Sequence, residues 1–94
     1  MRTIKRSSAF KRDYTRTKAN PRHAKDVDSL ICQIVEALVL DQELADKYRD
    51  HTLAGRWRDY RECHLKPDLL LIYEKPNASI LRLVRLGSHS ELFE

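Results

Sequence analysis

The apolar residues between positions 27 and 39 recur at the spacing of one helical face, which is the clearest periodic pattern in the chain. They are Val27, Leu30, Ile31, Ile34, Val35, Leu38 and Val39. Steps of three and four residues line up on one side of an α-helix, so the pattern predicts an amphipathic helix. Asn20 and Pro21 are typical of a helix start, with proline at the first helical position, so we expect the helix to begin there.

A shorter helix and a strand are expected before it. Ser7 or Ser8 can cap a helix in which Phe10 and Tyr14, four residues apart, share a buried face. Residues 3–6 form a candidate strand, with Ile4 as its only clear core residue. In a domain of this size, amphipathic helices most simply cover one face of a sheet.

Three further strands are predicted in the second half of the chain, at residues 57–65, 69–73 and 80–86. The first alternates between two faces, and the second is a continuous apolar run of the kind found in central strands. Turn-forming residues at 66–68 and 76–77 separate successive strands, which predicts an antiparallel meander.

The predicted fold class is therefore α+β, as a single domain over residues 1–94. A small antiparallel sheet, made of the N-terminal strand and the three-strand meander, carries two helices on one face. Trp57 is assigned to the core between these layers.

The formal net charge of +4 and the pI of about 9.3 favour an anionic partner. No apolar run approaches the roughly 18 residues that a transmembrane helix needs, and the polar N-terminus lacks the apolar centre of a signal peptide. We therefore expect a cytoplasmic protein that makes no membrane contact.

The two cysteines, Cys32 and Cys63, fall in unrelated segments and are expected to be free thiols. Cys63 could join His51, His64 and His89 around zinc, but the closely spaced ligand pair of a zinc finger is missing. The sequence predicts neither a metal site nor a cofactor.

Groups that transfer protons and bind phosphate gather in two segments, residues 49–68 and the C-terminal tail. A histidine near neutral pH can accept or return a proton, and an arginine fork can hold a phosphate. Because Asp68 follows His64 across a strand turn, their side chains are expected to lie close. We predict one site for a phosphodiester, with catalytic residues His51, His64, Asp68, Arg85 and His89.

Four more residues are predicted to contact the substrate. Tyr60 and Phe93 offer rings on which bases could stack, and Arg61 and Lys66 add positive charge. Each candidate alone has a simpler interpretation: a surface histidine, a turn-forming aspartate, or a core phenylalanine. The residue pattern alone favours these simpler interpretations, and the catalytic interpretation depends on resemblance to a known family.

The stretches DHTLAGRWRDYRECHLKPDLLLIYE and LVRLGSHSELF resemble the YafQ branch of the RelE/ParE toxin superfamily. Its members share the patterns D-H-x-L-x-G-x-W, R-x-x-H-x-x-P-D-x-x-L-I-Y and R-x-G-x-H-x-x-L-F, and the match covers roughly the C-terminal half of this chain. The resemblance implies a RelE-like fold. Relatives carry tryptophan after the aspartate, where this chain has Leu69.

The resemblance also implies a function: the toxin of a type II toxin-antitoxin pair that cleaves mRNA in the ribosomal A site. The implied partners are the ribosome, mRNA and a cognate antitoxin protein. The implied reaction needs no metal, because the ribose 2′-OH attacks the adjacent phosphate. The motifs place the family's active-site positions at His51, His64, Asp68, His89 and Phe93, and its conserved arginine at Arg85. Which group is the base and which is the acid stays open.

Two other functions remain to be weighed. ParE-type members of the superfamily inhibit DNA gyrase with the same fold but without this histidine cluster. A noncatalytic RNA-binding module would explain the basic charge, but not the grouping of proton-transfer residues.

Overall fold

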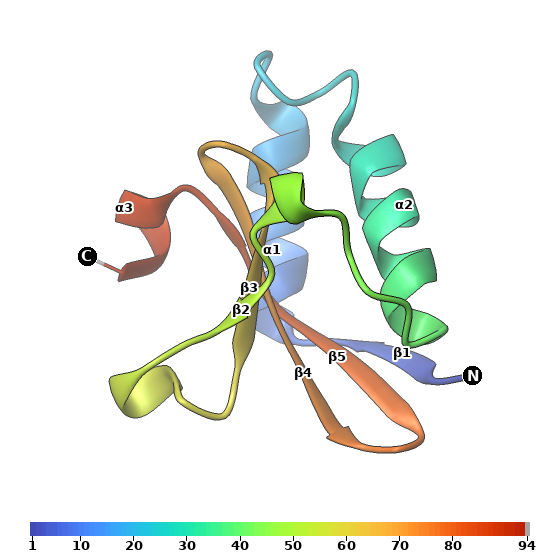
Figure 1. Cartoon of the computed structure of the whole chain (residues 1–94). Coiled ribbons are helices and arrows are strands. Elements are labelled where there is room, and N and C mark those ends of the chain that lie inside the picture. The colour runs from blue at the N-terminus through green and yellow to red at the C-terminus, as the bar shows by residue number, and fades with distance from the viewer. Residues whose placement is uncertain (94) are drawn as a thin grey trace.

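The structure is a computed structural model that describes residues 1–93 (Figure 1). Its helices are α1 (Ser8–Ala19), α2 (Val27–Val39) and α3 (His89–Phe93), with short 3-10 turns η1 (Asp46–Tyr48) and η2 (Gly55–Trp57). Its strands are β1 (Thr3–Arg6), β2 (His51–Thr52), β3 (Arg61–Lys66), β4 (Leu69–Asn77) and β5 (Ile80–Gly87).

The strands form one five-stranded sheet in the order β1-β5-β4-β3-β2. The predicted meander is confirmed, because β3, β4 and β5 pair antiparallel in succession. The sheet is nevertheless mixed, since β1 runs parallel to β5, and β2 is a further edge strand that the sequence pattern did not reveal. The α+β class is confirmed, while the expectation of a wholly antiparallel sheet was wrong.

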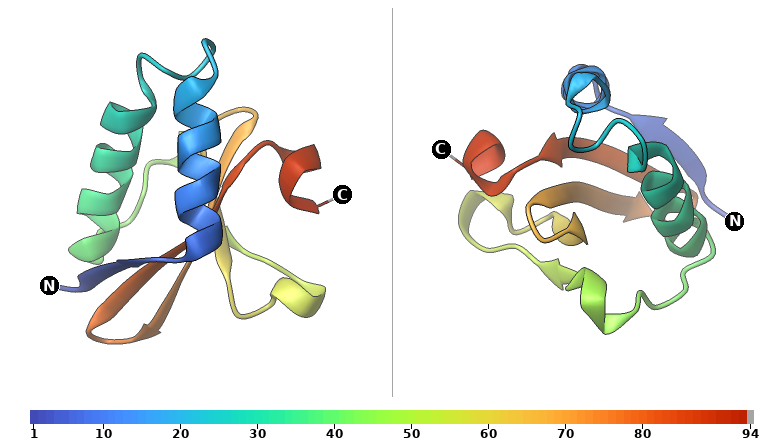
Figure 2. Two further views of the ribbon diagram at one scale, coloured as in Figure 1. Left: turned by 180° about the vertical axis from the view of Figure 1, so that it is seen from behind. Right: turned by 90° about the horizontal axis from the view of Figure 1, so that it is seen from above.

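Helices α1 and α2 lie side by side on one face of the sheet, as predicted, whereas α3 lies on the other side of the molecule from α2 (Figure 2). Successive side chains of β4 point to opposite faces of the sheet, and each set packs into a hydrophobic cluster on its own face. Leu69, Leu71 and Tyr73 join the main core beneath the two helices. Leu70 and Ile72 face a smaller cluster that includes Leu92 of α3 and the rings of Trp57 and Phe93. A strand that is buried on both faces reads as a continuous apolar run.

Two sequence-based boundaries were wrong near β3 and β4. Strand β3 begins at Arg61 rather than at residue 57, because the backbone at Gly55, with φ of 66°, leads into the 3-10 turn η2. Trp57 is therefore half-buried against the smaller cluster instead of lying in the main core. Strand β4 continues to Asn77, and the turn falls at residues 78–79.

Two predictions at the N-terminal half were also wrong. Ile4 is 45% exposed rather than buried in the core, because β1 is an edge strand of the sheet. Helix α2 begins at Val27, since residues 21–26 form turns in which the Asn20 side chain accepts a hydrogen bond from the Arg22 amide. Among residues 1–93, no helix combines the length and apolar character needed to cross a bilayer.

Because the central strand is buried, two leucine-to-alanine substitutions should differ strongly in their effect on the free energy of unfolding. Leu71 is 0% exposed, and Leu71→Ala should lower the free energy of unfolding by about 2–5 kcal/mol, because it leaves a cavity in the main core. Leu40→Ala is the matched control: Leu40 is 46% exposed, so the change should stay within about 0.5 kcal/mol. Urea denaturation followed by circular dichroism measures both. Equal losses would contradict this assignment of the core.

Candidate active site

A buried glutamate lies between two of the predicted histidines. Strand pairing sets His51 of β2 directly opposite Glu62 of β3, and His64 follows two residues later on the same face. The Glu62 Oε1 atom lies 3.5 Å from Nε2 of His51 and 3.3 Å from Nε2 of His64. The Glu62 side chain is only 7% exposed, and the two imidazole centroids are 6.3 Å apart. One carboxylate therefore orients both rings.

Glu62 was missing from the candidates drawn from the sequence. The sequence nevertheless indicates it. Residues two apart in a strand lie on the same face, so Glu62 must share the face of His64. Asp68 was expected to be the carboxylate beside His64, but in the structure Glu62 takes that place. Asp68 instead bonds to the start of α3.

Three hydrogen bonds fix the beginning of α3, the helix that carries His89 and Phe93. Oδ1 of Asp68 accepts from the His89 amide at 3.2 Å. Ser88 and Glu91 form a capping box: the Ser88 hydroxyl accepts from the Glu91 amide, and the Glu91 carboxylate accepts from the Ser88 amide. These bonds hold a helix that would be too short to form alone.

A row of aromatic rings continues from α3 toward β3. The ring of His89 lies 5.1 Å from that of Phe93, Phe93 lies 5.7 Å from Trp57, and Trp57 lies 5.6 Å from Tyr60. Edge-to-face arrangements at these distances are favourable. Tyr60 and Phe93, both predicted to contact the substrate, thus belong to one half-buried row that begins at His89.

The strand register brings Arg85 to the same part of the sheet as the histidine–glutamate cluster. Glu62 is opposite Ile72 of β4, and Ile72 is opposite Arg85 of β5. Neighbouring strands lie about 4.8 Å apart, so the backbones of Glu62 and Arg85 are separated by roughly 10 Å. The Arg85 side chain bonds Asp13 of α1, with Nε 2.7 Å from Oδ2 and Nη2 3.3 Å from Oδ1.

The other two cations predicted at the site make structural contacts. Arg61 approaches Asp50 and the Tyr73 hydroxyl, each at 3.3 Å. Lys66 binds the Asp26 carboxylate at 2.8 Å, which ties β3 to the turn before α2. Their roles as substrate contacts stay predictions.

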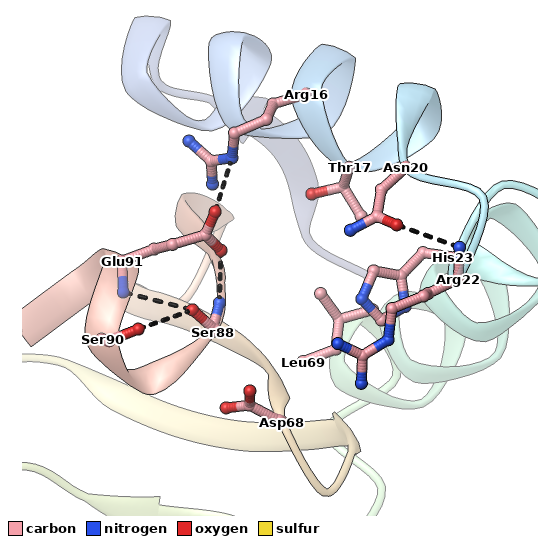
Figure 3. A pocket seen from close by; sticks show the side chains of 10 residues that line it. All are labelled: Arg16, Thr17, Asn20, Arg22, His23, Asp68, Leu69, Ser88, Ser90 and Glu91. Carbon is pink, nitrogen blue, oxygen red and sulfur yellow. Dashed lines mark hydrogen bonds and ion pairs between the residues drawn. The ribbon is translucent and has the colours of Figure 1, made fainter.

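Two pockets flank this region. One, of about 530 Å³, reaches His64 and Lys66 and is bordered by Lys47 and Arg49, so its mouth is positively charged. The other, of about 320 Å³, lies beside Asp68 between the end of α1, the turn before α2 and the start of α3 (Figure 3). The pocket at His64 has the charge that an RNA phosphate would require.

No group of three or more His, Cys, Asp or Glu residues in the part of the chain that the structure describes is arranged to hold a metal ion. In the histidine–glutamate cluster, both Nε2 atoms face the carboxylate directly. Cys32 and Cys63 are free, as predicted, with Cys63 buried and Cys32 exposed.

The contact between Asp68 and α3 gives a testable consequence. Asp68→Ala should speed amide hydrogen exchange throughout α3, because the His89 amide loses its acceptor, and should cost about 0.5–1.5 kcal/mol. Hydrogen–deuterium exchange read by NMR measures this, with Asp59→Ala, at an exposed position, as the matched control. Unchanged exchange in α3 would show that Asp68 does not anchor the helix.

The chain is similar to known proteins over almost its whole length. Residues 2–94 match a family model described as "Bacterial toxin of type II toxin-antitoxin system, YafQ". The mRNA interferase toxin YafQ of Escherichia coli strain B is 36% identical over 92 residues, covering 98% of this chain and 96% of the relative.

Solved structures give the same result. A metal-bound toxin from Helicobacter pylori has a TM-score of 0.87 and 49% identity, covering 99% of this chain and 100% of the other. An E. coli DinJ–YafQ complex has a TM-score of 0.84 and 33% identity, with both chains fully covered. The chain therefore belongs to the YafQ family of type II toxin-antitoxin toxins.

Proposed function

We propose that this chain is a toxin that cleaves mRNA as an endoribonuclease within the ribosomal A site and so inhibits translation. The observation that carries the proposal is Glu62, whose buried carboxylate faces His51 and His64. A histidine can accept or donate a proton, and two imidazoles beside one buried carboxylate offer the two roles that general acid–base cleavage of RNA needs. Relatives named mRNA interferase toxin support the substrate class.

The proposed reaction begins at the ribose 2′-OH. A neutral histidine or Asp68 removes its proton, and the oxygen attacks the adjacent phosphorus. As that bond forms, the bond from phosphorus to the 5′ oxygen breaks, and a protonated histidine gives its proton to the leaving oxygen. The products are a 2′,3′-cyclic phosphate and a 5′-OH, so atoms and charge balance without an external reactant.

Arg85 is proposed to stabilise the extra negative charge on the phosphate. Its Nε and Nη2 atoms face Asp13, which leaves Nη1 for a phosphate oxygen. The hydrogen bond to Asp13 raises the pKa of Arg85, so the guanidinium stays charged throughout. A fixed positive charge placed where negative charge develops is a large catalytic contribution.

We further propose that the chemistry needs no metal, since histidines supply both proton transfers and Arg85 supplies the charge. The ribosome would hold the mRNA with its 2′-OH in line with the phosphate, an alignment worth several orders of magnitude in rate. By analogy with the E. coli DinJ–YafQ complexes, a cognate antitoxin protein would bind the chain and block the site.

Primer extension on a defined mRNA in a purified translation system tests this function. The wild type should make discrete cuts only when ribosomes are present. Glu62→Gln and His89→Ala should slow cutting by about 100-fold or more, as expected for lost acid–base catalysis. Glu36→Gln, an acid-to-amide change at an exposed position of α2, is the matched control and should cut normally.

A chelator such as phenanthroline, which removes transition metals but leaves the magnesium that ribosomes need, should not change the rate. Loss of cutting with the chelator would contradict the metal-independent mechanism. Absence of cuts from folded wild type would contradict the nuclease itself, and gyrase supercoiling would then be measured.

A further inference from the structure

Asp13 is a nearly buried carboxylate of α1 that lies outside the proposed chemistry, with a side chain only 3% exposed. Three groups donate to it: the guanidinium of Arg85, the guanidinium of Arg16 at 3.1 Å, and the backbone amide of Leu86 at 3.0 Å. Burial opposes its charged form, but the bonds from Arg85 and Leu86 outweigh burial and lower its pKa. Asp13 is therefore charged near neutral pH.

The reason for this arrangement lies at the edge of β5. Strand β1 pairs with β5 only as far as Leu83, so the following residues of β5 lack a neighbouring strand on that side. Helix α1 supplies the missing partners: Asp13 accepts from the Leu86 amide, and Arg16 donates to the Leu86 carbonyl at 3.0 Å. Satisfying these backbone groups fixes α1 against the end of β5.

Arg16 extends the network to α3. Its Nε atom lies 3.1 Å from the Glu91 carboxylate, which in turn accepts from the Ser88 amide at 2.8 Å, as Figure 3 shows. Gly87 makes room for this contact. A Cβ atom there would lie 2.9 Å from Arg16 Nη2, closer than such atoms approach, and 3.0 Å from Glu91 Oε1, so the ends of these two side chains would have to shift. Asp13 thus connects Arg85 on one side with the start of α3 on the other.

We propose that Asp13 is a positioning residue of the active site. It holds Arg85, the proposed phosphate-binding residue, by direct hydrogen bonds, and it holds α3, the helix that carries His89, through Arg16 and Glu91. The inference rests on the proposed function. Asp13 touches neither substrate nor reacting atoms, so its effect must pass through Arg85 and α3. Small displacements of such groups cost large factors in rate.

The first measurement does not depend on catalysis. In ¹H–¹⁵N NMR spectra of the wild type, the Nε–H of Arg85 should exchange slowly with water, because Asp13 Oδ2 lies 2.7 Å from Nε. In Asp13→Ala, which leaves no side-chain acceptor, the signal should exchange rapidly, whereas in Glu36→Ala, the matched control at an exposed position, it should stay slow. A signal that stays slow in a folded Asp13→Ala variant would overturn the proposed contact.

The second measurement is single-turnover mRNA cleavage on ribosomes. Asp13→Asn should lower the rate at saturating toxin by about 10- to 100-fold, while the toxin concentration at half-maximal rate stays within about twofold. Gly87→Ala should slow the rate in the same way without removing any charge, because the added Cβ displaces Arg16 and Glu91. This variant tests the network even where Asp13→Asn fails to fold.

A double variant separates positioning from a general loss of stability. If Asp13 acts mainly through Arg85, then Asp13→Asn combined with Arg85→Ala should be little slower than Arg85→Ala alone. Rate losses that multiply would overturn the part of the proposal that runs through Arg85. Wild-type rates in both folded Asp13→Asn and Gly87→Ala would overturn the positioning role as a whole while leaving the nuclease intact. If the wild type does not cut mRNA, the proposed function is overturned, and the contacts of Asp13 then have no role in catalysis.

Discussion

The site depends on the pairing of β4 between β3 and β5. This pairing places Glu62, Ile72 and Arg85 in one row across three strands, and β2 extends the row to His51. A shift of one residue in any of these registers would turn a side chain of the row to the other face. Because both faces of β4 are buried, such a shift would also expose leucines, so the core that stabilises the fold also fixes the site.

Within residues 1–93, two carboxylates are buried, and each lies among basic groups that it helps to position. Glu62 faces two histidines, whereas Asp13 faces two arginines and a backbone amide. A buried charge is costly unless it is paired and hydrogen-bonded, so the partners of each acid are held in place as strictly as the acid itself. Such pairs give little net stability, but they specify geometry, which is the property that a catalytic site needs.

Several features could be read from the sequence because they rest on local periodicity. The α2 face and the buried run of β4 are examples, and both were predicted close to their observed positions. The capping box of Ser88 and Glu91 was also readable, yet a five-residue helix gives no periodic pattern to draw attention to it. Strand β2 has only two residues, too few for alternation to show.

Contacts between distant parts of the chain could not be predicted in this way. Arg85 and Asp13 are 72 residues apart, and their meeting depends on where β1 stops pairing with β5. The partner of His64 was mistaken for a different, local reason: the turn suggested Asp68, although the alternation of side chains along β3 places Glu62 on the same face as His64. The family motif located the candidate residues, and the structure shows which of them share a carboxylate.

In the mechanism that we propose, the ribose 2′-OH is the nucleophile and groups of this site activate it. The most direct measurement uses an mRNA with a single 2′-deoxy nucleotide on the 5′ side of a bond that the wild type cuts on the ribosome. We expect cutting to disappear at that bond and to continue at bonds with intact ribose. Cutting at an unchanged rate beside the deoxy nucleotide would contradict this mechanism.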